Sequence, residues 1–154
     1  MAQISIIIGS KTDEAFIKPA REILEQFGIN YELAVISAHR NPERLRKFVA
    51  EAGAKGIEVM IAAAGAAAHL PGVIASLNDN AIPVIGVPLP TSELKGVDSL
   101  YSIVQMPSGI PVACMGIGNS GAKNAALFAA QILGIKYPEI REKCINYRRN
   151  LEQG

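Results

Sequence analysis

The segment at residues 4–13 reads ISIIIGSKTD, and the fold can be built outward from it. Its first five residues are apolar except for one serine, which predicts a buried strand over residues 4–8. A glycine and polar residues follow at once, and Thr12 or Asp13 can cap a helix that begins there. A buried strand that turns directly into a helix is typical of βαβ units, in which the strands run parallel.

The same alternation of apolar runs and helical patterns continues along the chain. Four more apolar runs predict strands at about residues 31–36, 59–63, 83–87 and 112–115. The predicted helices run from Thr12 or Asp13 to Gly28, from Pro42 to Gly53 or Gly56, for a short stretch after Pro71, and over residues 97–104, 120–133 and 138–151. Pro19 removes an internal hydrogen bond, so we expect a kink or an interrupted first turn in the first helix.

Right-handed crossovers between parallel strands, with helices on both faces, predict a three-layer α/β/α sandwich. The leading topology is a five-stranded parallel sheet in the flavodoxin-like order 2-1-3-4-5, with an extra C-terminal helix. No linker, repeat or low-complexity tract divides the sequence, so we expect one α/β domain over residues 1–154. In this strand order the loops after the first three strands converge at one edge of the sheet.

Charge and composition indicate a small-molecule partner. The 15 basic and 14 acidic residues leave a formal charge of +1, which is too balanced for a nucleic-acid-binding protein or an anionic-membrane binder. Residues 59–78 carry no charged side chain over about the length that crosses a bilayer. His69, Pro71 and two glycines interrupt this stretch, so we expect a buried strand and a close-packed loop there instead of a membrane span.

The cysteines and the N-terminal residues predict a cytoplasmic protein. Cys114 and Cys144 are the two cysteines, and neither belongs to a CxxC motif or to a metal-ligand spacing, so we interpret both as reduced and structural. Residues 1–3 lead directly into the first strand without the basic flank or cleavage site of a leader.

Both histidines of the chain lie in loops directly after predicted strands. His39 stands in the loop SAHR after the second strand, and His69 in the loop GAAAHLPG after the third. Imidazole changes its charge near neutrality, and strand-end loops of α/β sheets are where ligands bind, so His39 is the candidate acid/base. His69 either lines the pocket and positions a carboxylate, or it has a structural role such as capping a helix.

The loop GSKTD at residues 9–13 has the features of a phosphate cradle. A glycine, two hydroxyls and free helix N-terminal amides suit a phosphate, and Asp13 can accept hydrogen bonds from ribose hydroxyls. Its spacing is not that of a P-loop, and a capped turn without a ligand remains an alternative for this loop taken alone. Arg40 in the neighbouring loop favours phosphate binding, because guanidinium can hold phosphate bidentately.

A second glycine-rich segment, GIGNSG at residues 116–121, matches the letters of a dinucleotide fingerprint. A dinucleotide fold needs a further strand that ends in an acidic residue about twenty positions later. Here residues 137–141 begin a predicted helix, so we reject NAD binding and interpret the glycines as sites of close packing between helix and sheet.

Four ordered motifs resemble one known family: GSKTD at 9–13, SAHRNP at 37–42, GAAAHLPG at 65–72 and GVDSLYSIVQMP at 96–107. They closely resemble the N5-carboxyaminoimidazole ribonucleotide mutases of purine biosynthesis, and the resemblance covers nearly the whole chain. It implies conversion of N5-carboxyaminoimidazole ribonucleotide (N5-CAIR) to 4-carboxyaminoimidazole ribonucleotide (CAIR) without ATP, cofactor or metal. It also implies a homo-octamer with sites near subunit contacts.

The resemblance assigns roles to particular residues. His39 matches the catalytic histidine of the family, and Ser10, Asp13 and Arg40 match positions that bind substrate. The other matching positions line the same pocket, and they are Thr12, Ser37, Ala38, Gly65, Ala66, His69 and Leu70. The family usually has glycine where Ala66 stands, and an aromatic residue often stands where this chain has Glu14.

These residue types suit a carboxyl transfer. Protonation of the carbamate nitrogen releases CO₂ and leaves aminoimidazole ribonucleotide (AIR), whose ring carbon attacks the CO₂ and then loses a proton. His39 can both give and take that proton. Small apolar residues at 62–68, with Leu70, are expected to form a dry wall of a sealed cavity around the CO₂, and loop amides to hold a carboxylate.

Two alternatives remain open on the sequence. The related carboxylase branch adds CO₂ directly to AIR in a similar pocket, and similarity favours the mutase. The other is a non-catalytic flavodoxin-like nucleotide-binding or signalling module. The loops after the first three strands contain no aromatic residue to stack on a flavin, and Ala63 and Ala64 stand where a phospho-receiver needs an aspartate.

Overall fold

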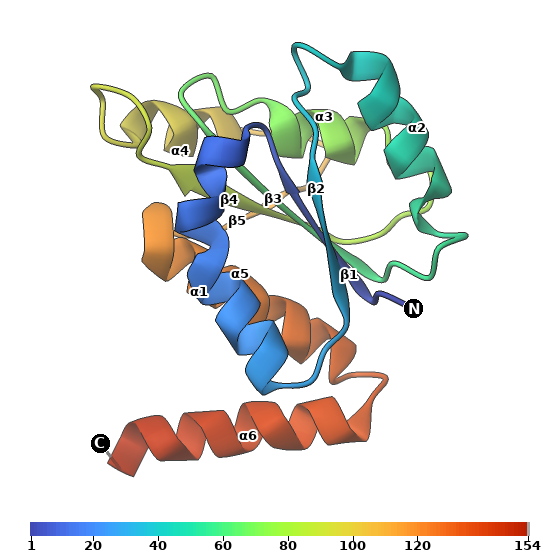
Figure 1. Cartoon of the computed structure of the whole chain (residues 1–154), viewed down its shortest axis with the longest axis vertical. Coiled ribbons are helices and arrows are strands. Elements are labelled where there is room, and N and C mark those ends of the chain that lie inside the picture. The colour runs from blue at the N-terminus through green and yellow to red at the C-terminus, as the bar shows by residue number, and fades with distance from the viewer. Residues whose placement is uncertain (154) are drawn as a thin grey trace.

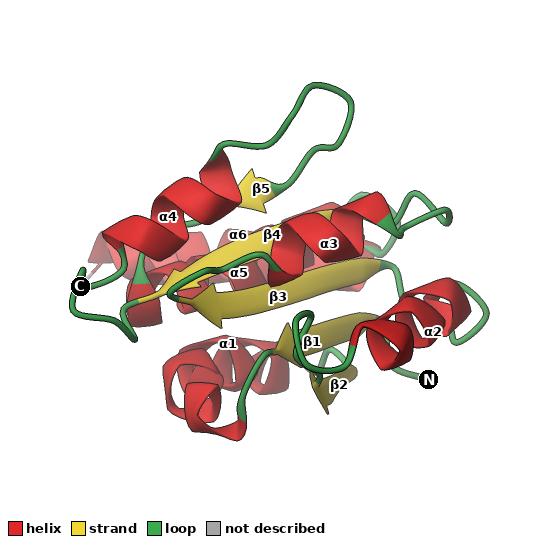
Figure 2. Cartoon of the chain, turned by 90° about the horizontal axis from the view of Figure 1, so that it is seen from above, coloured by secondary structure: helices red, strands yellow, loops and turns green. Residues whose placement is uncertain are grey.

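A five-stranded sheet forms the centre of the molecule in a computed structural model, which describes residues 1–153. Every neighbouring pair of strands is parallel. The strands are β1 (Ile4–Ile8), β2 (Tyr31–Val35), β3 (Val59–Gly65), β4 (Val84–Leu89) and β5 (Ala113–Cys114). They lie in the order β2-β1-β3-β4-β5, which confirms the predicted topology (Figure 2).

Helices cover both faces of the sheet. One face carries α1 (Glu14–Gln26) and α5 (Gly118–Leu133), and the other carries α2 (Pro42–Ala52), α3 (Leu70–Ser76) and α4 (Val97–Val104). The last helix, α6 (Pro138–Gln153), packs outside the layer of α1 and α5 (Figure 1). The three-layer α/β/α arrangement with an extra C-terminal helix is therefore as predicted.

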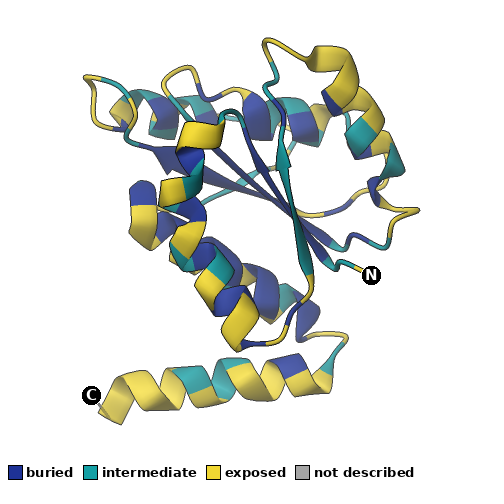
Figure 3. Ribbon diagram, viewed as in Figure 1, coloured by how far each residue is buried: buried dark blue, intermediate teal, exposed yellow. Residues whose placement is uncertain are grey.

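Alternation along β1 distributes its side chains between two cores. Ile4, Ile6 and Ile8 pack under α1 and α5, whereas Ile7 packs under the helices of the opposite face. The central strand β3 is buried from Val59 to Ala64, as expected for a strand covered on both sides. The edge strand β2 is only half-buried (Figure 3).

Local boundaries differ from the sequence-based prediction at a few points. Pro19 lies inside α1 without ending it, and the irregular turn is instead a 3-10 turn at Lys11–Asp13 that precedes the helix. Gly28 follows α1 with a φ of 62°, the left-handed conformation expected there. The strand β5 spans only Ala113–Cys114 and is therefore shorter than the expected strand over residues 112–115.

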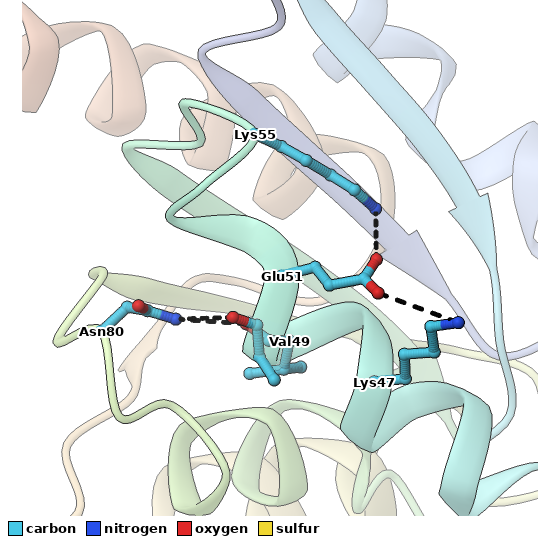
Figure 4. Close-up of polar contacts among 6 residues, drawn as sticks. Lys47, Val49, Glu51, Lys55 and Asn80 are labelled. Carbon is cyan, nitrogen blue, oxygen red and sulfur yellow. Dashed lines mark hydrogen bonds and ion pairs between the residues drawn. The ribbon is translucent and has the colours of Figure 1, made fainter.

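The end of α2 is tied to the loop between α3 and β4 (Figure 4). The Asn80 side-chain amide donates a hydrogen bond to the Val49 carbonyl at 3.3 Å. Glu51 forms ion pairs with Lys47 at 3.9 Å and Lys55 at 3.2 Å. Because these ion pairs are exposed to solvent, each contributes less than about 1 kcal/mol to stability.

Polar contacts attach α6 to the end of the sheet opposite the carboxyl ends of the strands (Figure 1). Tyr137 donates a hydrogen bond to one Glu58 carboxylate oxygen at 2.6 Å, and Lys136 pairs with the other at 2.9 Å. Lys143 also donates to the Phe27 carbonyl at 2.6 Å. Within residues 1–153, no helix combines the length and apolar character needed to cross a bilayer.

Candidate active site

The loops after β1, β2, β3 and β4 surround a cleft of about 270 Å³ at the carboxyl ends of the strands. Nine of the predicted site residues line it: Ser10, Thr12, Asp13, Ser37, Ala38, His39, Arg40, Gly65 and Leu70. A larger hollow of about 560 Å³ lies between α5 and α6, but neither a histidine nor a carboxylate lines it. The cleft is thus where the acid–base groups meet.

A reciprocal set of hydrogen bonds shapes the loop after β1. The Ser10 N–H donates to the Asp13 carboxylate at 3.1 Å, and the Thr12 N–H donates to the Ser10 hydroxyl at 3.4 Å. The hydroxyls of Ser10 and Thr12 also lie 2.9 Å apart. This capping box holds two hydroxyls and the first amides of the 3-10 turn beside the cleft, as a phosphate cradle requires.

Arg40 ties the loop after β2 to the loop after β1. Its guanidinium donates to the Gly9 carbonyl at 3.2 Å, and its backbone N–H donates to the Ser37 hydroxyl at 3.2 Å. One guanidinium nitrogen is thereby positioned over the β1 loop, next to Ser10. The cation and the hydroxyls that were predicted to bind phosphate therefore lie together.

Asp13 is the buried carboxyl group of the cleft, with 7% of its surface exposed. Burial raises the pKa of Asp13, while the hydrogen bond from the Ser10 N–H and the positive charge of Arg40 act in the opposite direction. A buried acceptor beside this loop could accept hydrogen bonds from the hydroxyls of a sugar.

The rings of the two histidines contact each other at the edge of the cleft. His39 Nε2 lies 2.9 Å from His69 Nδ1, and the two rings stand edge to face with their centroids 5.0 Å apart. At this distance one hydrogen lies between the two nitrogens, so one ring donates and the other accepts. When His39 carries hydrogens on both nitrogens, His69 can accept one of them and so hold the imidazolium in place.

The apolar wall is present only in part. Ala64, Ala68 and Leu70 are buried, but Ala67 is exposed, and so are His39 and His69. The sealed cavity expected from the sequence is therefore not formed by one chain alone, because no described segment of the same chain covers the histidine rings. His39 nevertheless shares the cleft with Ser10 and Arg40.

Ala66 lies beside the cleft and has a φ of 50°, in the left-handed region. An L-residue with a Cβ is disfavoured there, which is the physical reason why glycine suits this position. Ala66 and His69 are the predicted site residues that fall outside the cleft lining, although His69 contacts it through His39.

Thr91 lines the cleft and was missed by the sequence analysis. It follows the end of β4 by two residues, so the rule that polar residues after parallel strands converge would have pointed to it. The glycine-rich segment, in contrast, serves packing: a Cβ at Gly121 would lie 1.6 Å from the Gly116 carbonyl oxygen. Among residues 1–153, no three His, Cys, Asp or Glu side chains are placed to hold a metal ion.

Comparison with known proteins identifies the family of this chain. Residues 3–154 match the sequence model of AIR carboxylase. The chain belongs to the AIR carboxylase family. A Thermotoga maritima relative named N5-carboxyaminoimidazole ribonucleotide mutase is 54% identical over 153 residues, which are 99% of this chain and 87% of that protein.

Two further comparisons support membership of the family. A Pyrococcus horikoshii protein with the same name as the Thermotoga relative is 57% identical over 150 residues, covering 97% of this chain and 82% of that protein. The crystal structure of Treponema denticola PurE is similar with a TM-score of 0.86 and 30% identity, over 97% of this chain and 91% of that chain.

Proposed function

We propose that this protein is an N5-carboxyaminoimidazole ribonucleotide mutase, an isomerase that converts N5-CAIR to CAIR in de novo purine (IMP) biosynthesis. The main support for the proposal is that His39, Ser10 and Arg40 line the same cleft. The chain is also 54% identical to a protein named as this mutase over 99% of its length. An acid–base group beside a phosphate cradle fits a reaction that moves a carboxyl group on a ribonucleotide.

The reaction balances with His39 as the single proton carrier. Protonated His39 gives its proton to the carbamate nitrogen, the bond from that nitrogen to the carboxyl carbon breaks, and CO₂ and AIR remain. The C4 carbon of AIR then attacks CO₂ and becomes tetrahedral. Neutral His39 removes the hydrogen from C4, which restores the aromatic ring and the protonated histidine.

The other residues of the cleft bind and orient the nucleotide in this proposal. Ser10, Thr12 and Arg40 hold the phosphate, and Asp13 accepts a hydrogen bond from the ribose. The Ser37 hydroxyl accepts a hydrogen bond from the Arg40 backbone N–H and so orients that residue. Ala38, Gly65 and Leu70 shape the apolar side of the cleft, with Ala66 beside it. Holding AIR and CO₂ in place between the two half-reactions is worth several orders of magnitude in effective concentration.

We further propose that the chain assembles as a homo-octamer in the cytoplasm, without nucleic-acid or membrane partners. Exposed apolar side chains on and before α4 support contacts with other copies, and they are Leu94, Val97, Tyr101 and Val104. Between 46% and 64% of the surface of each residue is exposed. A group of exposed large apolar residues on one surface is typical of a protein–protein contact. Sedimentation of the purified protein tests the assembly.

One comparison of substrates tests the proposed reaction. Purified protein is expected to convert N5-CAIR to CAIR in the absence of ATP, and the His39→Asn variant is expected to turn over at least about 100-fold more slowly while still folded. The rival activity is direct carboxylation, in which the protein consumes AIR and CO₂. If AIR with CO₂ is turned over and N5-CAIR is not, the mutase proposal is wrong and the direct carboxylase takes its place.

A further inference from the structure

Thr91 occupies a fixed place at the end of the cleft formed by β3 and β4. Gly65 pairs with Leu89 in the parallel ladder of these strands, so Thr91, two residues beyond Leu89, lies beside the start of the β3 loop. The Thr91 backbone N–H donates to the Leu89 carbonyl at 3.0 Å, which bends the chain directly after β4. The side chain of Thr91 lines the same cleft as His39.

The absence of a side chain at Gly65 makes room for Thr91. A Cβ built on Gly65 would lie 1.7 Å from the Thr91 hydroxyl oxygen, 2.8 Å from its Cβ and 3.0 Å from its methyl carbon. The Thr91 side chain therefore rests against the backbone of β3. Within residues 1–153, no hydrogen bond engages the Thr91 hydroxyl, so it is free to bind a ligand in the cleft.

The order of the strands separates this hydroxyl from the phosphate cradle. Arg40 follows β2 and Ser10 follows β1, whereas Thr91 follows β4 on the other side of β3. Between these two ends the β3 side of the cleft is lined by Ala64, Ala67 and Leu70, whose side chains donate no hydrogen bonds. A nucleotide anchored through its phosphate at Ser10 and Arg40 and lying along this wall would have its other end near Thr91.

We propose that the Thr91 hydroxyl donates a hydrogen bond to the carboxylate of the bound nucleotide and so lets the site distinguish carboxylated from uncarboxylated aminoimidazole ribonucleotide. This inference rests on the proposed function, because that function supplies the carboxylate. A hydroxyl in an otherwise apolar wall favours an anionic group, since a carboxylate in contact with alanine and leucine alone loses its hydration without compensation. A hydrogen bond to a charged group is worth roughly a 10-fold to 100-fold difference in affinity.

Binding of two ligands to matched variants tests the inference. Thr91→Val keeps the branched shape that rests against Gly65 but removes the donor, and Thr91→Ser keeps the donor but removes the methyl group. Dissociation constants for CAIR and for AIR are measured by titration calorimetry with each protein at one salt concentration. Thr91→Val is expected to weaken CAIR binding roughly 10-fold to 100-fold and to change AIR binding by less than about 2-fold. Thr91→Ser is expected to bind both ligands like the unmodified protein.

The outcomes separate this inference from the proposed function. Equal affinities of Thr91→Val and the unmodified protein for CAIR, or equal losses for CAIR and AIR, overturn the role of the hydroxyl. If the unmodified protein binds neither CAIR nor AIR, the proposed function fails and the inference fails with it. If circular dichroism shows that Thr91→Val does not fold, Thr91→Ala takes its place. The inference is supported if Thr91→Ala loses the preference for CAIR over AIR while Thr91→Ser keeps it. It is overturned if these two variants show the same preference.

Discussion

Replacing Ala66 with glycine is expected to stabilise the protein. Ala66 has a φ of 50° and is exposed, so glycine would relieve backbone strain without removing buried contacts. The left-handed conformation costs an L-residue about 1–2 kcal/mol. The greater conformational freedom of glycine in the unfolded chain offsets about 0.4–1 kcal/mol of this gain in the free energy of unfolding. The mid-values of these two ranges leave a net gain of about 0.8 kcal/mol, which for a chain of this size raises Tm by about 2–3 °C.

Urea denaturation and thermal unfolding at one protomer concentration measure this gain, because assembly makes Tm depend on concentration. Ala81 provides the matched control: it is exposed, has a φ of 53° and lies outside the cleft lining, so Ala81→Gly is expected to stabilise by a similar amount. Ala67, which has no positive φ, provides the opposite control, and Ala67→Gly is expected to destabilise the protein. An Ala66→Gly variant that is no more stable than the parent would refute the strain argument.

Three further predictions concern titratable groups of the cleft. His39→Asn is expected to lower kcat by about 10²–10⁴-fold with the fold and CAIR binding largely retained, and substantial remaining turnover would exclude His39 as the proton carrier. His69→Leu removes the acceptor 2.9 Å from His39 and is expected to lower kcat at least about tenfold, whereas His69→Asn, with an acceptor oxygen near the place of Nδ1, is expected to keep most activity; equal losses would contradict this role. Because burial raises the pKa of Asp13 above 3.8 in the folded state, ionised Asp13 costs stability as pH rises through that folded-state pKa. Asp13→Asn is therefore expected to be more stable than the parent at pH 7 in urea denaturation, with the difference vanishing below pH 3.8, and a less stable variant at pH 7 would contradict it.

The sequence was sufficient for the architecture because its periodic signals are strong. The apolar segment Ile4–Ile8, which holds four isoleucines and one serine, and the glycine after the first helix indicated the first βα unit. The alternation of elements then favoured a parallel sheet. The ends of helices and strands were harder to predict where the local preference of a residue and its tertiary packing favour different structures. Pro19, for example, was expected to kink or interrupt α1, and the helix continues through it from Glu14 to Gln26.

The cleft was predictable as a place, but its contacts were not. Strand order alone indicates that the loops carrying His39 and His69 converge, yet the 2.9 Å contact between their rings depends on side-chain orientations that no local pattern encodes. Thr91 could have been placed at the cleft by the same rule, because it follows β4 by two residues. Its contact with Gly65 could not, because that contact depends on the register of β3 against β4, which is a tertiary property.

The contacts of Glu58 with Lys136 and Tyr137 lie at the end of the sheet away from the loops that line the cleft. The attachment of α6 and the loops of the candidate site thus lie at opposite ends of one sheet (Figure 1). Substitutions at Glu58, Lys136 or Tyr137 can therefore change how firmly α6 is held, and with it the heat tolerance of the protein, while the loops of the cleft keep their arrangement. The same separation leaves the outer side of α6 as a practical point for attaching a fluorophore or a surface linker.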